Sequence, residues 1–295
     1  MKYIFIAATC ILLLSSSCRL DNFLYNPNAL DSYKFDDYEG ELRFTLDDSY
    51  AIDTALIHLM TLESGPEEDR ETIYAAYIGN IDSIAVDTVI LYCHGNAAHM
   101  DAYWPRVKLL ANTGGKNRFG VLFMDYRGFG MSTGKPTEAG MYYDVDACMQ
   151  WLKDKGLTND RLIINGFSLG CAPSCELTAN PRSMQASKII LEAPFASFDY
   201  IVQDVAKLSL PGSLYANLEV DNAEEIKKIN IPFLWVHGIE DDFIGIEHGA
   251  LIAQNYQGVH KVERRIVGGG HSTIPPVMGY DQFMQLMLDF ITGAI

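Results

Sequence analysis

The sequence predicts an α/β fold: a mainly parallel central sheet with an antiparallel N-terminal hairpin, helices on both faces and a small cap. The main observation is that apolar β runs alternate with helical candidates from Thr88 onward. The β runs are 88–93, 119–124, 161–165, 188–192, 232–237 and 261–267, and the helical candidates are 100–112, 137–155, 169–179, 247–256 and 280–292. Such alternation requires a mainly parallel sheet covered by helices on both faces.

The remaining elements follow from shorter patterns. Two alternating runs, 54–62 and 71–78, flank a polar stretch and predict the hairpin at the sheet edge. The cap is expected between Ala193 and Ile231, with helices at 199–208 and 222–228. Because the chain has 295 residues and shows no internal repeat, we expect one large α/β domain.

Composition limits the classes of partner. The hydrophobic fraction of 48% is typical of a soluble globular enzyme. The formal net charge of −16 would repel a phosphate backbone, so nucleic acid is excluded as a partner.

The first 18 residues are typical of an export signal. Lys2 precedes an apolar run, Tyr3 to Leu14, that is shorter than the roughly twenty residues needed to span a bilayer. The ending Ser15-Ser16-Ser17-Cys18 resembles a bacterial lipobox, in which the cysteine becomes the lipidated first residue. We therefore expect an exported protein, anchored through Cys18 to the periplasmic or cell-surface face of a bacterial membrane. The alternative is a plain signal peptide that is cleaved elsewhere.

The segment at 19–50 connects this signal to the folded domain, which we place at 51–295. It has no strong periodicity but contains several aromatic side chains, namely Phe23, Tyr25, Tyr33, Phe35 and Tyr38. These aromatics indicate a segment that lies partly on the domain rather than a free linker.

A sharp turn after the third predicted strand of the alternating region carries the candidate nucleophile. The turn reads Gly166-Phe167-Ser168-Leu169-Gly170 and lies between an apolar β run and a run of small residues suited to a helix. In a G-x-S-x-G turn the serine occupies the apex, and the glycines leave room where a Cβ would collide with neighbouring elements. Ser168 is therefore the candidate nucleophile.

A serine hydroxyl needs a base and an orienting acid to react at neutral pH. Asp241 follows the strand 232–237, and His271 follows the strand 261–267 in a glycine-rich loop. Both positions lie past the carboxyl end of a strand, where open α/β sheets place their ligands. We assign Asp241 as the acid and His271 as the base. Three other acids remain possible: Glu240, Asp242 and Glu192.

Besides a nucleophile, a base and an acid, such a site needs hydrogen-bond donors for the oxyanion that forms during the reaction. The loop after the first strand of the alternating region, His94-Gly95-Asn96-Ala97-Ala98, is expected to supply the backbone N–H of Asn96, and Leu169 is expected to supply a second N–H. His94 is expected to brace this loop rather than to take part in chemistry. Asp125 and Arg127 are likewise expected to hold neighbouring loops.

Taken together, these motifs resemble those of the α/β-hydrolases. Within that superfamily the chain resembles serine hydrolases that share five motifs. These motifs are HGN at 94–96, DYRGFGMS at 125–132, GFSLG at 166–170, HGIED at 237–241 and GGGH at 268–271. The likeness covers about residues 55–295, and the group includes eukaryotic protein depalmitoylases and bacterial hydrolases of unassigned substrate. One departure is that many relatives carry glycine where Ala98 stands.

The cysteines and histidines show no spacing typical of zinc, and no glycine-rich phosphate loop precedes a lysine, so we expect no metal and no cofactor. Cys93, Cys148, Cys171 and Cys175 fall in strands and helices, where buried thiols are favoured over disulfides.

The expected function is hydrolysis of carboxylic esters or thioesters through Ser168, His271 and Asp241. The substrate would be a small-molecule or acyl ester, and the small cap favours short to medium acyl groups. Two alternatives remain: a serine peptidase with the same fold, and a binding protein that has lost catalysis.

Overall fold

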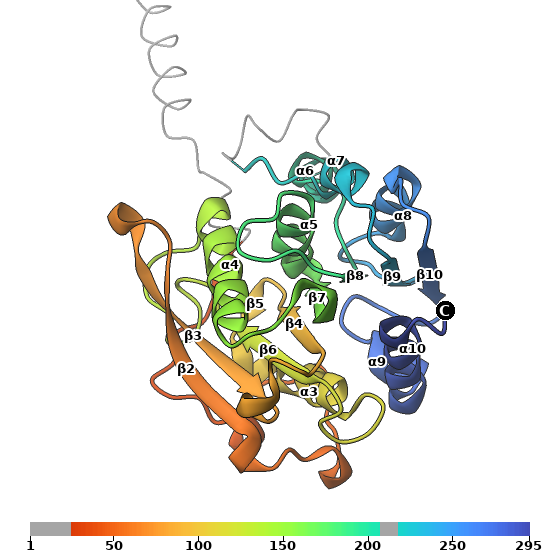
Figure 1. Ribbon diagram of the computed structural model, residues 1–295. Helices are drawn as coiled ribbons and strands as arrows, with labels where there is room; N and C mark the ends of the chain where they lie inside the picture. Colours follow the sequence, from red (N-terminus) through yellow and green to blue (C-terminus); the bar gives the residue numbers. More distant parts are fainter. Residues whose placement is uncertain (1–24, 207–217) are drawn as a thin grey trace, which may run out of the picture.

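The computed structural model describes residues 25–206 and 218–295 (Figure 1). The predicted signal at 1–18, including Cys18, lies outside the described residues. Within them, no helix combines the length and the apolar character needed to cross a membrane.

The centre of the domain is a sheet that contains eight strands among the described residues, in the order β10-β9-β8-β7-β4-β6-β3-β2 (Figure 1). Its strands are β2 (Ile57–Ser64), β3 (Glu71–Ile78), β4 (Val89–Cys93), β6 (Gly120–Met124), β7 (Leu162–Phe167), β8 (Lys188–Glu192), β9 (Phe233–Gly238) and β10 (Lys261–Ile266). β3 pairs antiparallel with both β2 and β6, and the other neighbours are parallel. The predicted fold class is thereby confirmed.

Helices cover both faces of this sheet (Figure 1). They are α3 (Met100–Asn112), α4 (Glu138–Asp154), α5 (Cys171–Ala179), α6 (Phe198–Ala206), α7 (Asn222–Glu225), α8 (Ile246–Asn255), α9 (Ile274–Met278) and α10 (Tyr280–Thr292). Of the helices in the described parts of the chain, only α9 has no counterpart among the predicted helices. This five-residue element contains two consecutive prolines, Pro275 and Pro276, which give no helical periodicity to read.

Two hydrophobic cores result from the alternation of side chains along each strand. In β4, Leu91 and Cys93 face one core with α4 and α5, whereas Ile90 and Tyr92 face the other core with α3 and α10. Burial on both faces explains why the central strands read as continuous apolar runs.

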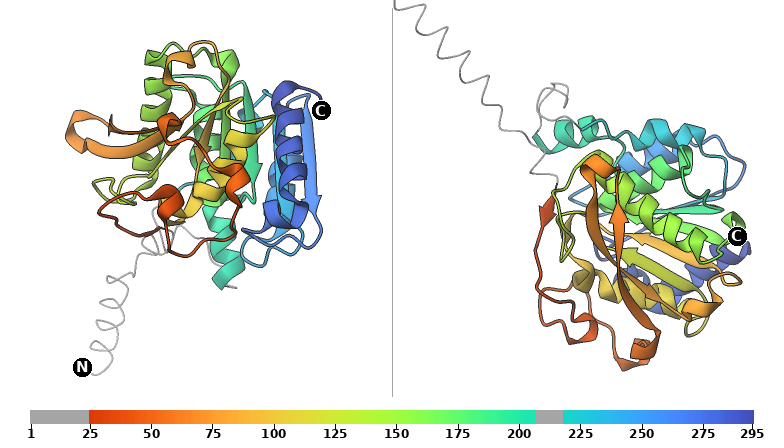
Figure 2. Two further views of the ribbon diagram at one scale, coloured as in Figure 1. Left: turned by 90° about the horizontal axis from the view of Figure 1, so that it is seen from below. Right: turned by 60° about the vertical axis from the view of Figure 1, so that its left-hand side comes forward.

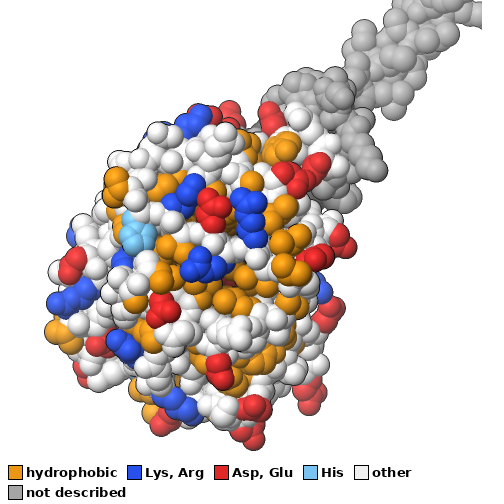
Figure 3. Space-filling view, turned by 90° about the vertical axis from the view of Figure 1, so that its right-hand side faces the viewer, with side chains coloured by type: hydrophobic (Ala, Val, Ile, Leu, Met, Phe, Trp, Pro, Cys, Tyr) orange, Lys and Arg blue, Asp and Glu red, His pale blue; other side chains and the backbone are white. Residues whose placement is uncertain are grey.

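The edge strand β10 carries charged side chains that disfavour pairing with another molecule. Glu263 forms ion pairs with Lys261 at 3.0 Å and with Arg265 at 3.3 Å. Figure 3 shows basic and acidic side chains next to one another among apolar ones on the side of the molecule where β10 lies. Charged side chains on an edge strand disfavour pairing with the edge of another molecule.

The described part of the N-terminal segment packs against the domain, as its aromatic residues predict. The ring of Phe35 lies 4.9 Å from that of Trp104 in α3, and the hydroxyl of Tyr33 donates to Asp125 at 2.7 Å. Further upstream, β1 (Asn26–Pro27) pairs in parallel with β5 (Ala97–Ala98). Figure 2 shows this red and orange segment running along the outside of the domain.

Arg127 has the structural role that its sequence context predicts. Its guanidinium forms ion pairs with Asp144 in α4 at 3.1 Å and with Asp69 at the tip of the hairpin at 2.8 Å. It therefore joins the hairpin to a helix.

The cap region between β8 and β9 contains α6 and α7 in its described part. The predicted helix at 222–228 is present as α7 followed by a 3-10 turn at Ile226–Lys228. The four cysteines of the described domain, Cys93, Cys148, Cys171 and Cys175, are buried and free, as predicted.

Candidate active site

The turn after β7 has the geometry expected of a nucleophile elbow. Ser168 has a φ of 53°, in the left-handed region that side chains other than glycine seldom adopt. A Cβ on Gly166 would lie 2.5 Å from the carbonyl oxygen of Gly170, and a Cβ on Gly170 would overlap the carbonyl group of Cys93. Both glycines are therefore required by close approach of the backbone, which is the reason inferred from the sequence.

The structure brings Ser168, His271 and Asp241 into one hydrogen-bonded series. His271 Nε2 lies 2.9 Å from Ser168 Oγ, and His271 Nδ1 lies 2.8 Å from Asp241 Oδ2. The three side chains come from the loops after β7, β9 and β10, at the carboxyl edge of the sheet. In this arrangement the imidazole can accept the serine proton while the carboxylate holds Nδ1–H.

Asp241 is held as an ionised carboxylate. Its Oδ1 accepts the backbone N–H groups of Phe243 at 3.0 Å and Ile244 at 2.8 Å. Burial by itself raises the pKa of Asp241, but the hydrogen bonds with His237 and His271 outweigh that effect and lower the pKa well below its usual range. The group is therefore ready to stabilise a positive charge on His271.

His237 supports this carboxylate, a role that the sequence motif alone did not reveal. The ring is fully buried, with Nε2 2.9 Å from the Ile244 carbonyl and 3.3 Å from Asp241 Oδ2. Trp235 Nε1 donates to its Nδ1 at 3.2 Å, so the neutral ring carries its proton on Nε2. That proton faces the Ile244 carbonyl and Asp241 Oδ2.

The other candidate acids have different partners. Glu192 is buried and forms an ion pair with Arg106 at 2.9 Å. Glu240 accepts the backbone N–H of Gly268, and Asp242 is exposed. Among the three, none is hydrogen-bonded to His271 in the described structure. The geometry favours Asp241.

Four other histidines are also engaged elsewhere. The nearest polar partners of His58, His248 and His260 are the Gly79 carbonyl at 3.1 Å, the Ala196 N–H at 3.1 Å and the Ile295 carbonyl at 3.0 Å. His94 is fully buried: Nδ1 donates to the Gly95 carbonyl at 2.7 Å, and Nε2 lies 3.2 Å from Asp125. Its contacts agree with a bracing role in the loop.

The loop expected to bind the oxyanion lies beside Ser168. Asn96, Ala97 and Ala98 line the same pocket as Ser168, and Leu169 directly follows Ser168 in the turn that leads into α5. No described residue accepts a hydrogen bond from the backbone N–H of Asn96. Ala98 has a φ of 65°, which explains why glycine suits this position.

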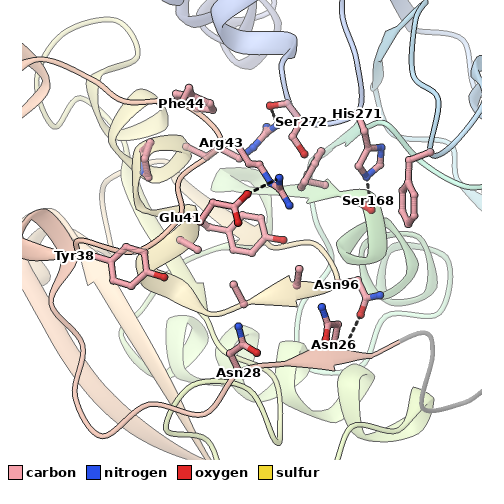
Figure 4. Close-up of a pocket in the computed structure, with 18 of the residues that line it drawn as sticks. Asn26, Asn28, Tyr38, Glu41, Arg43, Phe44, Asn96, Ser168, His271 and Ser272 are labelled. Atoms are coloured by element: carbon pink, nitrogen blue, oxygen red, sulfur yellow. Dashed lines mark hydrogen bonds and ion pairs between the residues drawn. The ribbon is translucent and has the colours of Figure 1, made fainter.

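These residues open into a pocket of about 810 Å³. One wall comes from the N-terminal segment through Asn26, Asn28, Tyr38, Glu41, Arg43 and Phe44, as Figure 4 shows. Phe167 and Phe243 also line the pocket, and their rings lie 5.2 Å and 5.0 Å from that of His271. The sequence did not indicate that residues before the domain would line the site.

Arg106 is another residue of the site that sequence patterns missed. Its guanidinium carbon lies 3.9 Å from the centre of the Phe167 ring, and Nη2 donates to the Ser272 carbonyl at 3.2 Å. The buried ion pair with Glu192 fixes its position. Arg106 therefore links the turn before Ser168 to the loop that carries His271.

No group of His, Cys, Asp and Glu side chains in the described parts of the chain has an arrangement that could hold a metal ion.

Comparison with known proteins agrees with this architecture. Residues 88–210 match the family described as "alpha/beta hydrolase fold". The Escherichia coli protein YfhR is 30% identical over 212 residues, covering 70% of each chain, and human alpha/beta hydrolase domain-containing protein 17B is 28% identical over 208 residues, covering 70% of this chain and 67% of that protein.

Among solved structures, the Pyrococcus furiosus esterase Pf2001 superposes with a TM-score of 0.67 at 17% identity, over 92% of this chain and 98% of the esterase. This likeness concerns the fold. Together with the sequence relatives, it shows that the chain belongs to the α/β-hydrolase family.

Proposed function

We propose that the protein is a serine hydrolase that cleaves carboxylic esters or thioesters. The observation that carries this proposal is the hydrogen-bonded series from Ser168 Oγ through His271 to Asp241, with distances of 2.9 and 2.8 Å. The esterase named among the structural neighbours lends support at the level of the fold.

In the proposed first half-reaction, Ser168 Oγ attacks the substrate carbonyl while its proton passes to His271 Nε2. The N–H groups of Asn96 and Leu169 stabilise the oxyanion of the tetrahedral intermediate. His271 then protonates the departing alkoxide or thiolate as its bond to the carbonyl carbon breaks, which leaves an acyl group on Ser168.

In the second half-reaction, His271 takes a proton from water, and the resulting hydroxide attacks the acyl-enzyme. Nε2 returns the proton to Ser168 Oγ when the acid is released. Throughout, Asp241 keeps Nδ1–H in place and stabilises the imidazolium. We expect short to medium acyl groups, since the described part of the cap is small.

A fluorophosphonate probe tests the nucleophile. It should label the purified protein, and Ser168→Ala should abolish the labelling. Ser272→Ala is the matched control, because Ser272 lines the same pocket and follows the proposed base directly. Labelling that survives in Ser168→Ala, or its absence in the folded wild-type protein, would contradict the proposal.

Ester and amide substrates with the same acyl group separate the esterase from the peptidase reaction. We expect ester hydrolysis to exceed amide hydrolysis by orders of magnitude. The opposite preference would identify a peptidase.

We also propose that the protein is exported and anchored through a lipid on Cys18. The support for this is the lipobox-like pattern before that residue. The acidic chain, with a formal net charge of −16, would be repelled by anionic lipid headgroups, so membrane residence would depend on the anchor.

A further inference from the structure

The loop that carries Asn96 is tied to the N-terminal segment by backbone hydrogen bonds. The N–H of Asn26 lies 3.2 Å from the Asn96 carbonyl oxygen and 3.0 Å from Asn96 Oδ1. The N–H of Asn28 donates to the Ala98 carbonyl at 3.4 Å. Figure 4 shows Asn26 and Asn96 joined directly below Ser168.

This pairing is separate from the central sheet. Within the described residues, β5 pairs only with β1, in a two-stranded sheet of its own. The strands that position Ser168, Asp241 and His271 therefore give no ladder hydrogen bonds to the loop at Ala97–Ala98. The N-terminal strand supplies them.

The loop also needs such support because its backbone is strained. Ala98 has a φ of 65°, in the left-handed region, which is unfavourable for an L-residue other than glycine. Strained conformations persist at functional sites when surrounding contacts hold them. Here the surrounding contacts include the hydrogen bonds from the N–H groups of Asn26 and Asn28.

We propose that β1 is a positioning element for the oxyanion site: the backbone N–H of Asn26 holds the carbonyl and side-chain oxygens of Asn96, and thereby fixes the residue whose own N–H is the proposed oxyanion donor. The inference rests on the proposed function. By this reasoning, part of the segment before the domain belongs to the catalytic apparatus.

Other contacts secure the N-terminal segment independently. Asp101 accepts the backbone N–H groups of Lys34 and Phe35, and Phe35 packs on Trp104. Loss of a single hydrogen bond at Asn26 should therefore leave the segment on the domain and change only the loop.

The test compares two substitutions at one position. Asn26→Pro removes the side chain and the N–H, whereas Asn26→Ala removes the side chain and keeps the N–H. Proline is tolerated here because Asn26 precedes Pro27 and already favours an extended backbone. Activity is expressed as kcat per active site, titrated with the fluorophosphonate, so that misfolded protein lowers the titre without lowering kcat.

We expect Asn26→Pro to lower kcat per site about 10- to 100-fold with KM unchanged, because removal of a whole oxyanion donor costs about 10²- to 10³-fold. The kcat per site of Asn26→Ala should be at least about tenfold higher than that of Asn26→Pro. The proposal would be overturned if the two variants had equal kcat values, or if Asn26→Pro raised KM and left kcat unchanged.

If Asn26→Pro does not fold, Asn96→Ala provides a second test, since it removes the Oδ1 acceptor and keeps the proposed donor. A several-fold lower kcat per site with unchanged KM supports the inference, and a wild-type kcat refutes it. Both kcat values are measured on protein that the probe labels at Ser168. If the proposed function were wrong, the labelling itself would fail, so that failure can be told apart from failure of this inference.

Discussion

Replacement of Asp241 by asparagine tests how the surrounding donors set the proton position on His271. In the native site, Oδ1 accepts two backbone N–H groups, from Phe243 and Ile244, and Oδ2 lies 2.8 Å from His271 Nδ1. In Asp241→Asn the amide oxygen should take the Oδ1 position, because an NH₂ group cannot accept those two bonds. The NH₂ group then faces His271.

The consequence for catalysis is large. The amide would donate to Nδ1, so the imidazole proton would move to Nε2 and Ser168 would lose its base. Loss of the correct tautomer lowers kcat by about 10⁴-fold in enzymes with this arrangement, which corresponds to about 5 kcal/mol of transition-state stabilisation. Because His237 Nε2–H lies 3.3 Å from the same Oδ2, two donors would also oppose each other there.

The assay is kcat for hydrolysis of p-nitrophenyl butyrate, with circular dichroism as the check on folding. Asp242→Asn is the matched control: Asp242 is the neighbouring residue but is exposed. We expect Asp242→Asn to stay within about twofold of wild type, since surface substitutions away from a site have small effects. If folded Asp241→Asn keeps more than about a tenth of the wild-type kcat, the assignment of the acid is wrong.

Four further predictions concern stability and anchoring. Ala98→Gly should raise the free energy of unfolding by about 0.5–1 kcal/mol, because it relieves a φ of 65°; an unchanged melting temperature would argue against strain there. Gly170→Ala should destabilise the domain by more than about 3 kcal/mol in urea unfolding, since its Cβ would overlap the Cys93 carbonyl; a wild-type midpoint would show that the turn can shift. The pKa of Asp241 is lower in the folded than in the unfolded protein, so its stabilising contribution is complete above about pH 5 and is lost as the pH falls below about 4; wild type should therefore lose more stability than Asp241→Asn over this window, and parallel losses would contradict the hydrogen-bond argument. Cys18→Ala should release the protein from membranes or leave it unprocessed, because each buried methylene of an anchor contributes about 0.8 kcal/mol; processed protein that stays bound after a high-salt wash would exclude the lipid anchor.

The predictions of strands, helices and turns within the domain needed only local information, and they agree with the structure. Strand and helix alternation from Thr88 onward follows from side-chain periodicity, which is readable in any window of a dozen residues. The glycines at 166 and 170 are required by the shape of one turn, so their pattern identifies the turn without knowledge of the rest of the fold. The order of Ser168, Asp241 and His271 along the chain predicted which loops would meet, because carboxyl ends of parallel strands share one edge.

What only the tertiary structure decided depends on contacts between distant residues. Asn26 meets Asn96 across 70 positions, and Arg106 meets Ser272 across 166 positions, and neither pair leaves a periodic signal in the sequence. The support of Asp241 by His237 is similar in kind: the two residues are four apart, but the path of the loop after β9 decides that Nε2 faces the carboxylate. Periodicity and turn chemistry show how the backbone folds locally. The pocket wall formed by the N-terminal segment instead arises from the packing of Phe35 on Trp104 and from a backbone hydrogen bond at position 26. Because any residue other than proline has the N–H for that bond, the sequence at position 26 does not reveal it.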